Sequence, residues 1–153
     1  MGDRGNNRLQ IFDLEGNYIG VGADGSTALG NDQFGIILQN GDDGTTIVNN
    51  VISDGSNIYI STADNTTIQG NYIGTDASGN AIVGGIRGID VSSLMTGSLT
   101  IGGAGAGEGN VIAGQTNEGI RNSADNVVIQ GNHIGVGADG TTALGNGSDG
   151  IYI

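Results

Sequence analysis

GNYIGVGADGSTALGN at residues 16–31, GNYIGTDASGNAIVGG at 70–85 and GNHIGVGADGTTALGN at 131–146 are three copies of one motif. Such self-similarity indicates a repeat architecture, in which each unit buries its apolar face against its neighbours. The first glycines of the copies lie 54 and 61 positions apart, which is too long for one coil of a solenoid. Shorter repeats must therefore divide each interval.

Three ladders of isoleucine divide these intervals. In the first, an asparagine precedes each isoleucine by two residues. Its asparagines are Asn17, Asn50, Asn71, Asn110 and Asn132, and its isoleucines are Ile19, Ile52, Ile73, Ile112 and Ile134. The second, just upstream of the first, is Ile11, Ile47, Ile68, Ile101 and Ile129, and the third is Ile36, Ile58, Ile89, Ile120 and Ile151. The pattern predicts three short strands per coil and about five coils.

Apolar and polar residues alternate within these strands. Ile89, Asp90 and Val91 show the period of two, so one face of each strand is expected to be buried. Coils wound in parallel would stack each strand about 4.8 Å from its counterpart. A right hand is expected because parallel crossovers overwhelmingly take it. We therefore predict an all-β fold, a right-handed parallel β-helix that forms a single domain over residues 1–153.

The composition fits thin β-layers better than a conventional globular core. The 153 residues include 32 glycines and no proline, cysteine or tryptophan, and only 4% are aromatic. So much glycine weakens helices, and so few bulky side chains make an ordinary core hard to build. The absence of cysteine is compatible with either redox compartment.

The charge narrows the range of partners. Sixteen acidic residues stand against four basic ones, and the formal net charge is −12. Such a surface repels phosphate backbones and anionic lipids, so neither nucleic acid nor a membrane surface is an expected partner. No apolar run is long enough to span a bilayer, and the first residues contain no signal-peptide core.

The uneven coil lengths arise from inserts. Twelve-residue segments at 20–31, 74–85 and 135–146 interrupt some coils and not others, and a glycine-rich insert lies at 102–110. We expect all four to emerge from the same edge of the solenoid, where variable or binding surfaces are commonly found.

The asparagine column is interpreted as structural. Asparagine side chains stacked at strand spacing can hydrogen-bond to one another and to the turn backbone. Four of the five asparagines follow a glycine, which suits a corner with positive φ. These glycines are Gly16, Gly70, Gly109 and Gly131.

GNYIGTDASGNAIVGG, GNHIGVGADGTTALGN and NVIAG resemble the repeats of large bacterial right-handed β-helix surface proteins of the adhesin type. The resemblance covers nearly the whole chain. It implies a β-helix in an extracellular or cell-surface setting and supplies no catalytic residues. The middle copy departs from it, because Ile82-Val83-Gly84-Gly85 stands where the other copies have ALGN.

One outward column is the candidate ligand-binding surface. It runs Ile37, Tyr59, Asp90, Arg121 and Tyr152. Asp90 and Arg121 would be cross-strand neighbours, close enough to form a surface ion pair. The flanking Tyr59 and Tyr152 make this face the best candidate for contact with a polysaccharide. No second carboxylate stands beside Asp90, so a catalytic acid and base pair is not evident.

Calcium is the alternative role for the excess carboxylate. Asp149 lies in GNGSDGIY, a single match to the calcium-binding nonapeptide, while Asp24 and Asp139 occupy Asp-Gly turns that could ligate an ion through loop carbonyls. An Asp-Gly pair is more commonly a plain turn, so no cofactor is assigned. His133 replaces Tyr18 and Tyr72 of the other copies and is interpreted as a surface side chain. Asn122 either interrupts an inward column or turns outward at a corner.

These observations favour a non-catalytic extracellular structural solenoid: a spacer, an adhesive stalk or a filament subunit. The chain ends on the first strand of a coil and begins near the second, and no polar cap is visible at either end. It would therefore be either a segment of a longer solenoid or a subunit that stacks on itself head to tail. The alternative is a carbohydrate-binding or carbohydrate-cleaving β-helix that uses the Tyr59 face.

Overall fold

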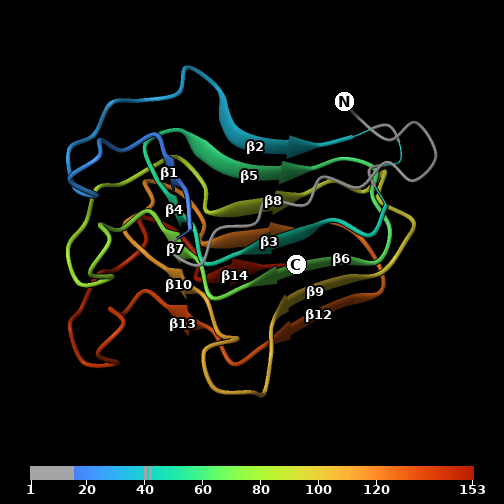
Figure 1. Ribbon diagram of the computed structural model, residues 1–153. Helices are drawn as coiled ribbons and strands as arrows, with labels where there is room; N and C mark the ends of the chain where they lie inside the picture. Colours follow the sequence, from blue (N-terminus) through green and yellow to red (C-terminus); the bar gives the residue numbers. More distant parts are fainter. Residues whose placement is uncertain (1–15, 40, 42) are drawn as a thin grey trace.

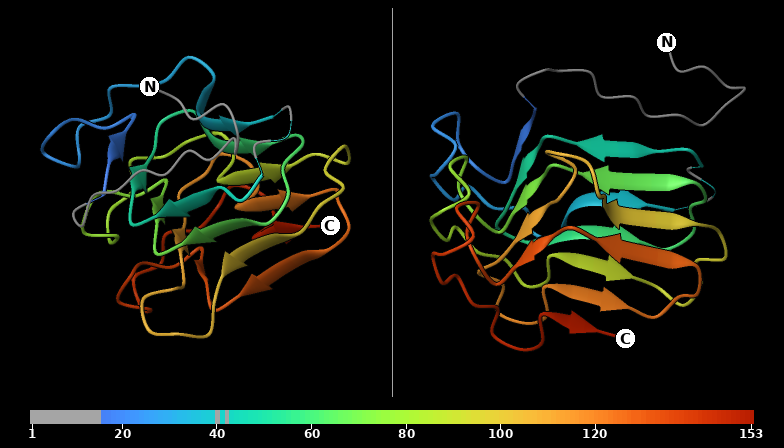
Figure 2. Two further views of the ribbon diagram at one scale, coloured as in Figure 1. Left: turned by 45° about the vertical axis from the view of Figure 1, so that its right-hand side comes forward. Right: turned by 90° about the horizontal axis from the view of Figure 1, so that it is seen from below.

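The computed structural model describes residues 16–39, 41 and 43–153, and this part of the chain is all-β, with no helix. Its strands form three parallel sheets (Figure 1). Successive strands join successive sheets, so three strands complete one coil, and about five coils stack along one axis (Figure 2). This is the parallel β-helix that the repeats predict.

Each sheet takes one strand from each coil. Sheet 1 contains β1 (Tyr18–Ile19), β4 (Val51–Ile52), β7 (Tyr72–Ile73), β10 (Val111–Ile112) and β13 (His133–Ile134). Sheet 2 contains β2 (Phe34–Leu38), β5 (Ser56–Ile60), β8 (Ile89–Val91), β11 (Ile120–Asn122) and β14 (Ile151–Tyr152). Sheet 3 contains β3 (Thr46–Val48), β6 (Thr66–Gln69), β9 (Leu99–Gly102) and β12 (Val127–Gln130).

The predicted isoleucine ladders are three columns of residues paired in register. The first column joins Ile19, Ile52, Ile73, Ile112 and Ile134. The second joins Ile36, Ile58, Ile89, Ile120 and Ile151, and the third joins Ile47, Ile68, Ile101 and Ile129. Ile11 lies outside the described residues. In the middle coils these side chains are fully buried, and each contributes about 1.5–3 kcal/mol of hydrophobic stabilisation.

The asparagine ladder occupies the corner between sheet 3 and sheet 1. In every pair, the backbone N–H and the side-chain amide of one asparagine donate to Oδ1 of the asparagine in the next coil, at 2.8–3.0 Å. The ladder links Asn17, Asn50, Asn71, Asn110 and Asn132, as predicted. The middle asparagines are buried, so water cannot hydrogen-bond to their polar groups. The neighbouring asparagines make those hydrogen bonds instead.

The corner glycines differ from the expectation at one position. Gly16, Gly70 and Gly131 have positive φ, whereas Gly109 does not. Gly109 is needed for a different reason, since a Cβ there would lie 2.0 Å from the carbonyl oxygen of Gly131. Asn49 takes the equivalent corner of its coil with φ 57°, a conformation that asparagine tolerates better than most residues.

The three 12-residue inserts are small hairpins. An antiparallel bridge joins the two arms of each one, and the bridges are Val21 with Ala28, Thr75 with Ile82, and Val136 with Ala143. The hairpins follow β1, β7 and β13 and stand above one another on the left side of Figure 1. Their common edge is the one predicted.

Hydrogen bonds between the tips join the hairpins into a continuous hairpin stack. Ala77 N donates to Gly25 O at 2.8 Å, and Ala138 N donates to Gly79 O at 2.9 Å. The strands that carry hairpins alternate in sheet 1 with β4 and β10, which carry none. Each hairpin therefore spans two coil heights, about 9.6 Å. This explains why long and short coils alternate in the sequence.

The glycine-rich insert does not share that edge, contrary to the prediction. It connects β9 to β10, so it leaves the solenoid at the corner between sheet 3 and sheet 1. The side chain of Glu108 closes it by accepting the N–H of Gly105 at 2.7 Å. The insert follows a strand of sheet 3, whereas each hairpin follows a strand of sheet 1. The two kinds of insert therefore leave the solenoid at different corners.

Asn122 points inward at the end of β11, in register with Val91, and it is buried. Its amide donates to Ala124 O at 3.1 Å and its Oδ1 accepts from Ala124 N at 3.2 Å. The side chain therefore caps the turn after β11 while it occupies an apolar column, which combines the two readings that the sequence leaves open.

Candidate functional site

Sheet 2 presents the predicted outward column to solvent. The residues pair in order from coil to coil: Ile37, Tyr59, Asp90, Arg121 and Tyr152. Tyr59, Asp90 and Arg121 line a shallow hollow of about 170 Å³. Tyr152 lies one strand further on and does not line this hollow, and its side chain is exposed.

Three serines complete the hollow, and sequence reasoning did not identify them. Ser92 and Ser93 follow β8, and Ser123 follows β11. They stand at equivalent ends of neighbouring strands, so parallel register brings them beside Asp90 and Arg121. Their position directly after the G-I strands is the sequence signal that could have identified them.

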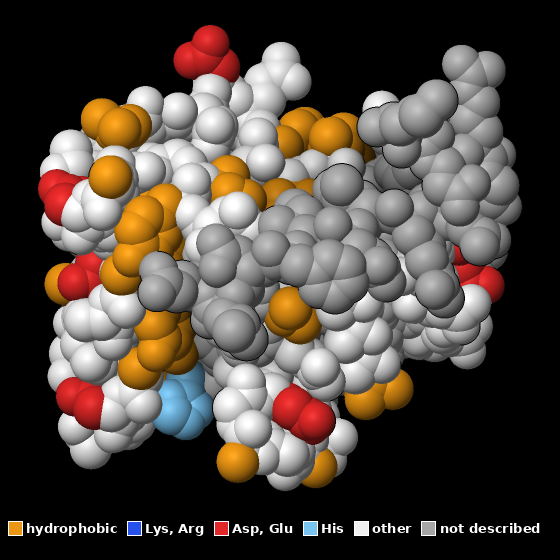
Figure 3. All heavy atoms as spheres, in the orientation of Figure 1, with side chains coloured by type: hydrophobic (Ala, Val, Ile, Leu, Met, Phe, Trp, Pro, Cys, Tyr) orange, Lys and Arg blue, Asp and Glu red, His pale blue; other side chains and the backbone are white. Residues whose placement is uncertain are grey.

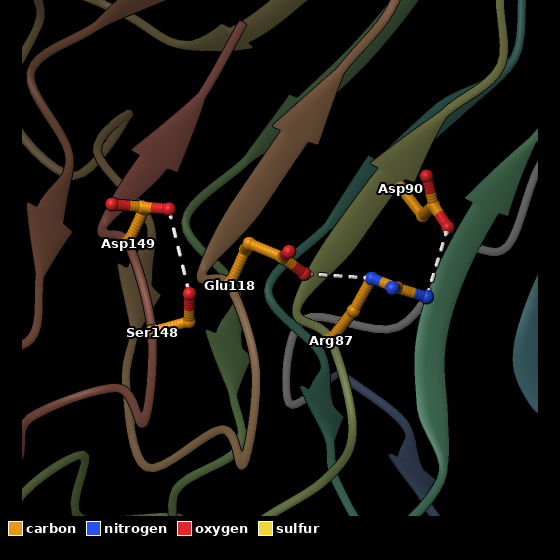
Figure 4. A network of polar contacts seen from close by, with 5 residues as sticks. All are labelled: Arg87, Asp90, Glu118, Ser148 and Asp149. Atoms are coloured by element: carbon orange, nitrogen blue, oxygen red, sulfur yellow. Dashed lines mark hydrogen bonds and ion pairs between the residues drawn. The ribbon is translucent and has the colours of Figure 1, made fainter.

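The predicted ion pair between Asp90 and Arg121 is replaced by another. Arg87 Nη1 lies 3.6 Å from Asp90 Oδ2, and Arg87 Nε donates to Glu118 Oε2 at 2.7 Å (Figure 4). Among the residues that the structure describes, no ion pair joins Asp90 to Arg121. Arg87 precedes β8 in its own coil, so its long side chain reaches both carboxylates and takes the place expected for Arg121.

The same contacts set the ionisation of this face. The hydrogen bond from Arg87 lowers the pKa of Glu118 below its ordinary value, and the charges of Arg87 and Arg121 lower it further. Two arginines thus stand against two carboxylates on an otherwise strongly acidic protein. Asp149 stands beside Glu118 at the start of the next strand (Figure 4), so carboxylates still outnumber arginines here.

Tyr59 is held by an aromatic contact. Its ring stacks on Phe34 with centroids 5.0 Å apart and planes inclined by 24°. Such pairs contribute about 0.5–1.5 kcal/mol beyond the area that they bury. The ring that borders the hollow is therefore oriented before any ligand arrives.

The hollow is lined mostly by polar groups. Its lining combines a phenol ring, one carboxylate, one guanidinium, three serine hydroxyls and Val91. Glycoside hydrolysis ordinarily requires two carboxyl groups on opposite sides of the scissile bond, about 5–9.5 Å apart. Asp90 is the only carboxylate in the lining, so the groups present can donate and accept hydrogen bonds to a polar ligand.

The carboxylates considered for calcium are occupied by their own turns. Asp24 accepts hydrogen bonds from Ser26 N and from the backbone and hydroxyl of Thr27. Asp139 repeats the arrangement with Thr141 and Thr142. These bonds, the threonine hydroxyl first, lower the pKa of both aspartates to about 2. Both therefore act as the turn-forming residues of the hairpin tips.

Asp149 stands apart from the other two and from the sheet 2 hollow. Ser148 Oγ donates to its Oδ2 at 3.4 Å (Figure 4). Across the described part of the chain, no three His, Cys, Asp or Glu side chains converge as a metal site would require. Calcium binding at these positions stays a prediction.

Comparison with known proteins adds no relative. Neither the family models nor the curated proteins nor the solved structures include a match to this chain. Within the described ranges, no helix has the length and hydropathy needed to cross a membrane. The likeness to bacterial surface repeats remains a prediction, and function has to be inferred from geometry.

Proposed function

We propose that this chain is a non-catalytic structural solenoid of an extracellular or cell-surface protein, a spacer or adhesive stalk. The observation that supports this role is that its hydrogen bonds between coils run along the axis of the solenoid. The strand ladders, the asparagine ladder and the hairpin stack all run along one axis, from each coil to the next. Such a molecule resists extension along its length, because each coil is bonded to its neighbour at several points.

The hairpin stack distinguishes a spacer from a filament of directly stacked copies. Among the described strands of sheet 1, β1 and β13 lie at the two edges, and each carries a hairpin. A second copy placed with its β1 on β13 would bring two hairpins within one coil height, about 4.8 Å. Each hairpin needs about twice that height, so direct stacking is sterically disfavoured, and we favour the spacer.

Electron microscopy combined with a polysaccharide panel tests this proposal. At high concentration the purified chain should remain a monodisperse monomer without filaments, and it should leave every polysaccharide uncleaved. If the parent chain cleaves a polysaccharide and Asp90→Ala does not, the non-catalytic role is contradicted. Long filaments would contradict the spacer and restore the head-to-tail subunit.

The hollow on sheet 2 favours a second candidate, a carbohydrate-binding face. Tyr59 offers an oriented apolar ring, and Asp90 and Arg121 offer charged hydrogen-bonding groups beside the serine hydroxyls. Pockets that combine an aromatic wall with a few convergent polar groups are the usual form of small-ligand sites. In a binding assay, Asp90→Ala and Arg121→Ala should each weaken retention of a bound polysaccharide, while the exposed Asp125→Ala should not. Equal retention by all variants would remove this candidate.

A further inference from the structure

A second outward column, on sheet 1, differs from the sheet 2 face in having a two-coil period. Large and small side chains alternate along it, in the register Tyr18, Val51, Tyr72, Val111 and His133. The valines are buried, whereas the side chain of Tyr18 is 46% exposed. The rings therefore form ridges above a valine floor, and the ridges recur every two coils, about 9.6 Å apart.

The spaces between the ridges are two hollows of similar construction. The first, of about 230 Å³, lies over Val51 between Tyr18 and Tyr72. The second, of about 310 Å³, lies over Val111 between Tyr72 and His133. Tyr72 borders both. Apolar side chains gather in a vertical band above the pale blue histidine in Figure 3, at the height of β1 to β10 in Figure 1.

The hairpin stack forms one wall of both hollows and fixes the rings. Ala77 lines the first hollow and Ala138 the second. Each ring packs against the tip glycine of its own hairpin. A Cβ would lie 3.4 Å from Tyr18 Cζ at Gly25, 3.1 Å from Tyr72 Cε1 at Gly79 and 3.7 Å from His133 Cε1 at Gly140. The groove is thus preformed, which lowers the entropic cost of binding.

The two-coil period distinguishes between two extended peptide conformations. A polyproline II helix has three residues per turn and rises about 3.1 Å per residue, so every third residue faces the same side at intervals of about 9.3 Å. That interval matches the ridge spacing. An extended β-strand instead presents alternate residues on one side about 6.6 Å apart, which does not match.

We propose that the groove between the aromatic ridges of sheet 1 and the hairpin stack binds a proline-rich peptide in the polyproline II conformation. Prolines three residues apart would enter the two hollows, with Tyr72 between them. Aromatic-lined grooves are the general means by which proteins recognise this helix, whose rigidity reduces the entropy lost on binding.

Charge specifies the residues between the prolines. Each hairpin tip carries an aspartate. Asp24 and Asp139 hold the same place in their copies, and Asp76 stands two positions earlier in its own. Asp76 nevertheless accepts from the backbone of Asn80 and Ala81, the counterparts of the two residues that donate to Asp24, so the three carboxylates occupy similar places in the hairpin stack. The turn hydrogen bonds keep Asp24 and Asp139 ionised, with pKa values of about 2. Arginine or lysine at every third position would face these carboxylates. The fitting partner is therefore a basic, proline-rich segment, and an acidic one should be rejected.

Titration with synthetic peptides tests the inference on the intact chain. A peptide of repeated Pro-Pro-Arg should bind, and binding should weaken with added salt. A peptide of the same composition in shuffled order, and one of repeated Pro-Pro-Asp, should bind at least tenfold more weakly. If the ordered and shuffled peptides bind equally, the match of periods is refuted and the attraction is only one of charge.

Variants locate the site. Tyr72→Ala should weaken peptide binding at least tenfold relative to the parent. Because Tyr72 borders both hollows, this loss should exceed that of Tyr18→Ala. Tyr72→Phe should retain binding. Tyr152→Ala is the matched control, because Tyr152 is exposed on sheet 2 and lines none of the three hollows. It should bind as the parent does, with an unchanged far-ultraviolet circular dichroism spectrum for every variant. Equal affinity of Tyr72→Ala and the parent would overturn the assignment. So would Tyr72-dependent binding of a neutral oligosaccharide in the absence of peptide binding, which would identify a glycan groove.

Discussion

The asparagine ladder shows how single side chains hold one coil to the next. Asn71 is fully buried, and its Oδ1 accepts from the backbone and side-chain amides of Asn50. Its own amide donates to Asn110 Oδ1 and to the carbonyl oxygens of Ile47 and Gln69. One side chain therefore satisfies polar groups on three coils. This corner is stable only if the whole network is complete.

Replacing Asn71 by alanine should destabilise the protein strongly. The change removes the acceptor of the buried Asn50 backbone N–H and one hydrogen bond each from the Asn50 side-chain amide, Ile47 O and Asn110 Oδ1, and a buried group left unpaired costs about 1–3 kcal/mol. We expect the free energy of unfolding to fall by about 3 kcal/mol or more in denaturant titrations. Asn132→Ala, at the less buried end of the ladder, is the control and should lose less. Equal losses would show that the ladder does not act as a network.

The Arg87 bridge should make stability depend on pH in the acid range. Its hydrogen bond lowers the pKa of Glu118 in the folded protein, so the contact stabilises the fold above the ordinary carboxyl pKa. That contribution should disappear as the pH falls through the lowered folded value. In Arg87→Ala, a carboxyl titration followed by NMR should show the pKa of Glu118 rising towards its ordinary value. An unchanged pKa would show that the bridge does not form in solution.

At the scale of elements, the inserts are ordered by one another rather than by the coils alone. An isolated two-stranded hairpin is marginally stable at best. Here each one is two coils high, and the bond from Ala77 to Gly25 and the bond from Ala138 to Gly79 connect it to the next. The alternation of long and short coils is thus a geometric requirement of stacking.

Hydrogen exchange should reveal this order at the loop tips. The amides of Ala77 and Ala138 should exchange slowly despite their place at the surface, because each donates to the neighbouring hairpin. The amide of Ala23 occupies the equivalent position on the first hairpin and should exchange fast. Removal of residues 76–83 leaves eight positions from Ile73 to Ile89, as there are from Ile112 to Ile120, and it should make the Ala138 amide exchange fast as well. Persistent protection of Ala138 in that variant would contradict the hairpin stack.

At the scale of the whole molecule, the architecture could be predicted because the repeats encode it directly. The spacing of isoleucines and asparagines fixed the three sheets and their register, including the alignment of Tyr59, Asp90 and Arg121. The partner of Asp90 could not be predicted, because the choice between Arg87 and Arg121 depends on side-chain reach rather than on register. The position of the glycine-rich insert was predicted wrongly, because the prediction used the length of the insert and did not use the strands that it connects.

The sheet 1 groove was missed for a related reason. Reading Tyr18, Tyr72 and His133 one copy at a time indicates three separate surface side chains. Only the register that places Val51 and Val111 between them turns the rings into evenly spaced ridges. A two-coil period is therefore visible in the folded molecule and hidden in any single repeat.

The central claim is that distant segments of this chain stack as parallel strands in one fixed order, and paired cysteines test it most directly because the chain has none of its own. Thr100 on β9 pairs in register with Thr67 on β6 and with Val128 on β12. Cysteines at Thr67 and Thr100, or at Thr100 and Val128, should form an intramolecular disulfide under mild oxidation, because neighbouring strands lie within disulfide reach. Cysteines at Thr67 and Val128, two coils apart, should not. Efficient linkage of that last pair, with failure of the first two, would contradict the stacking order on which the account depends.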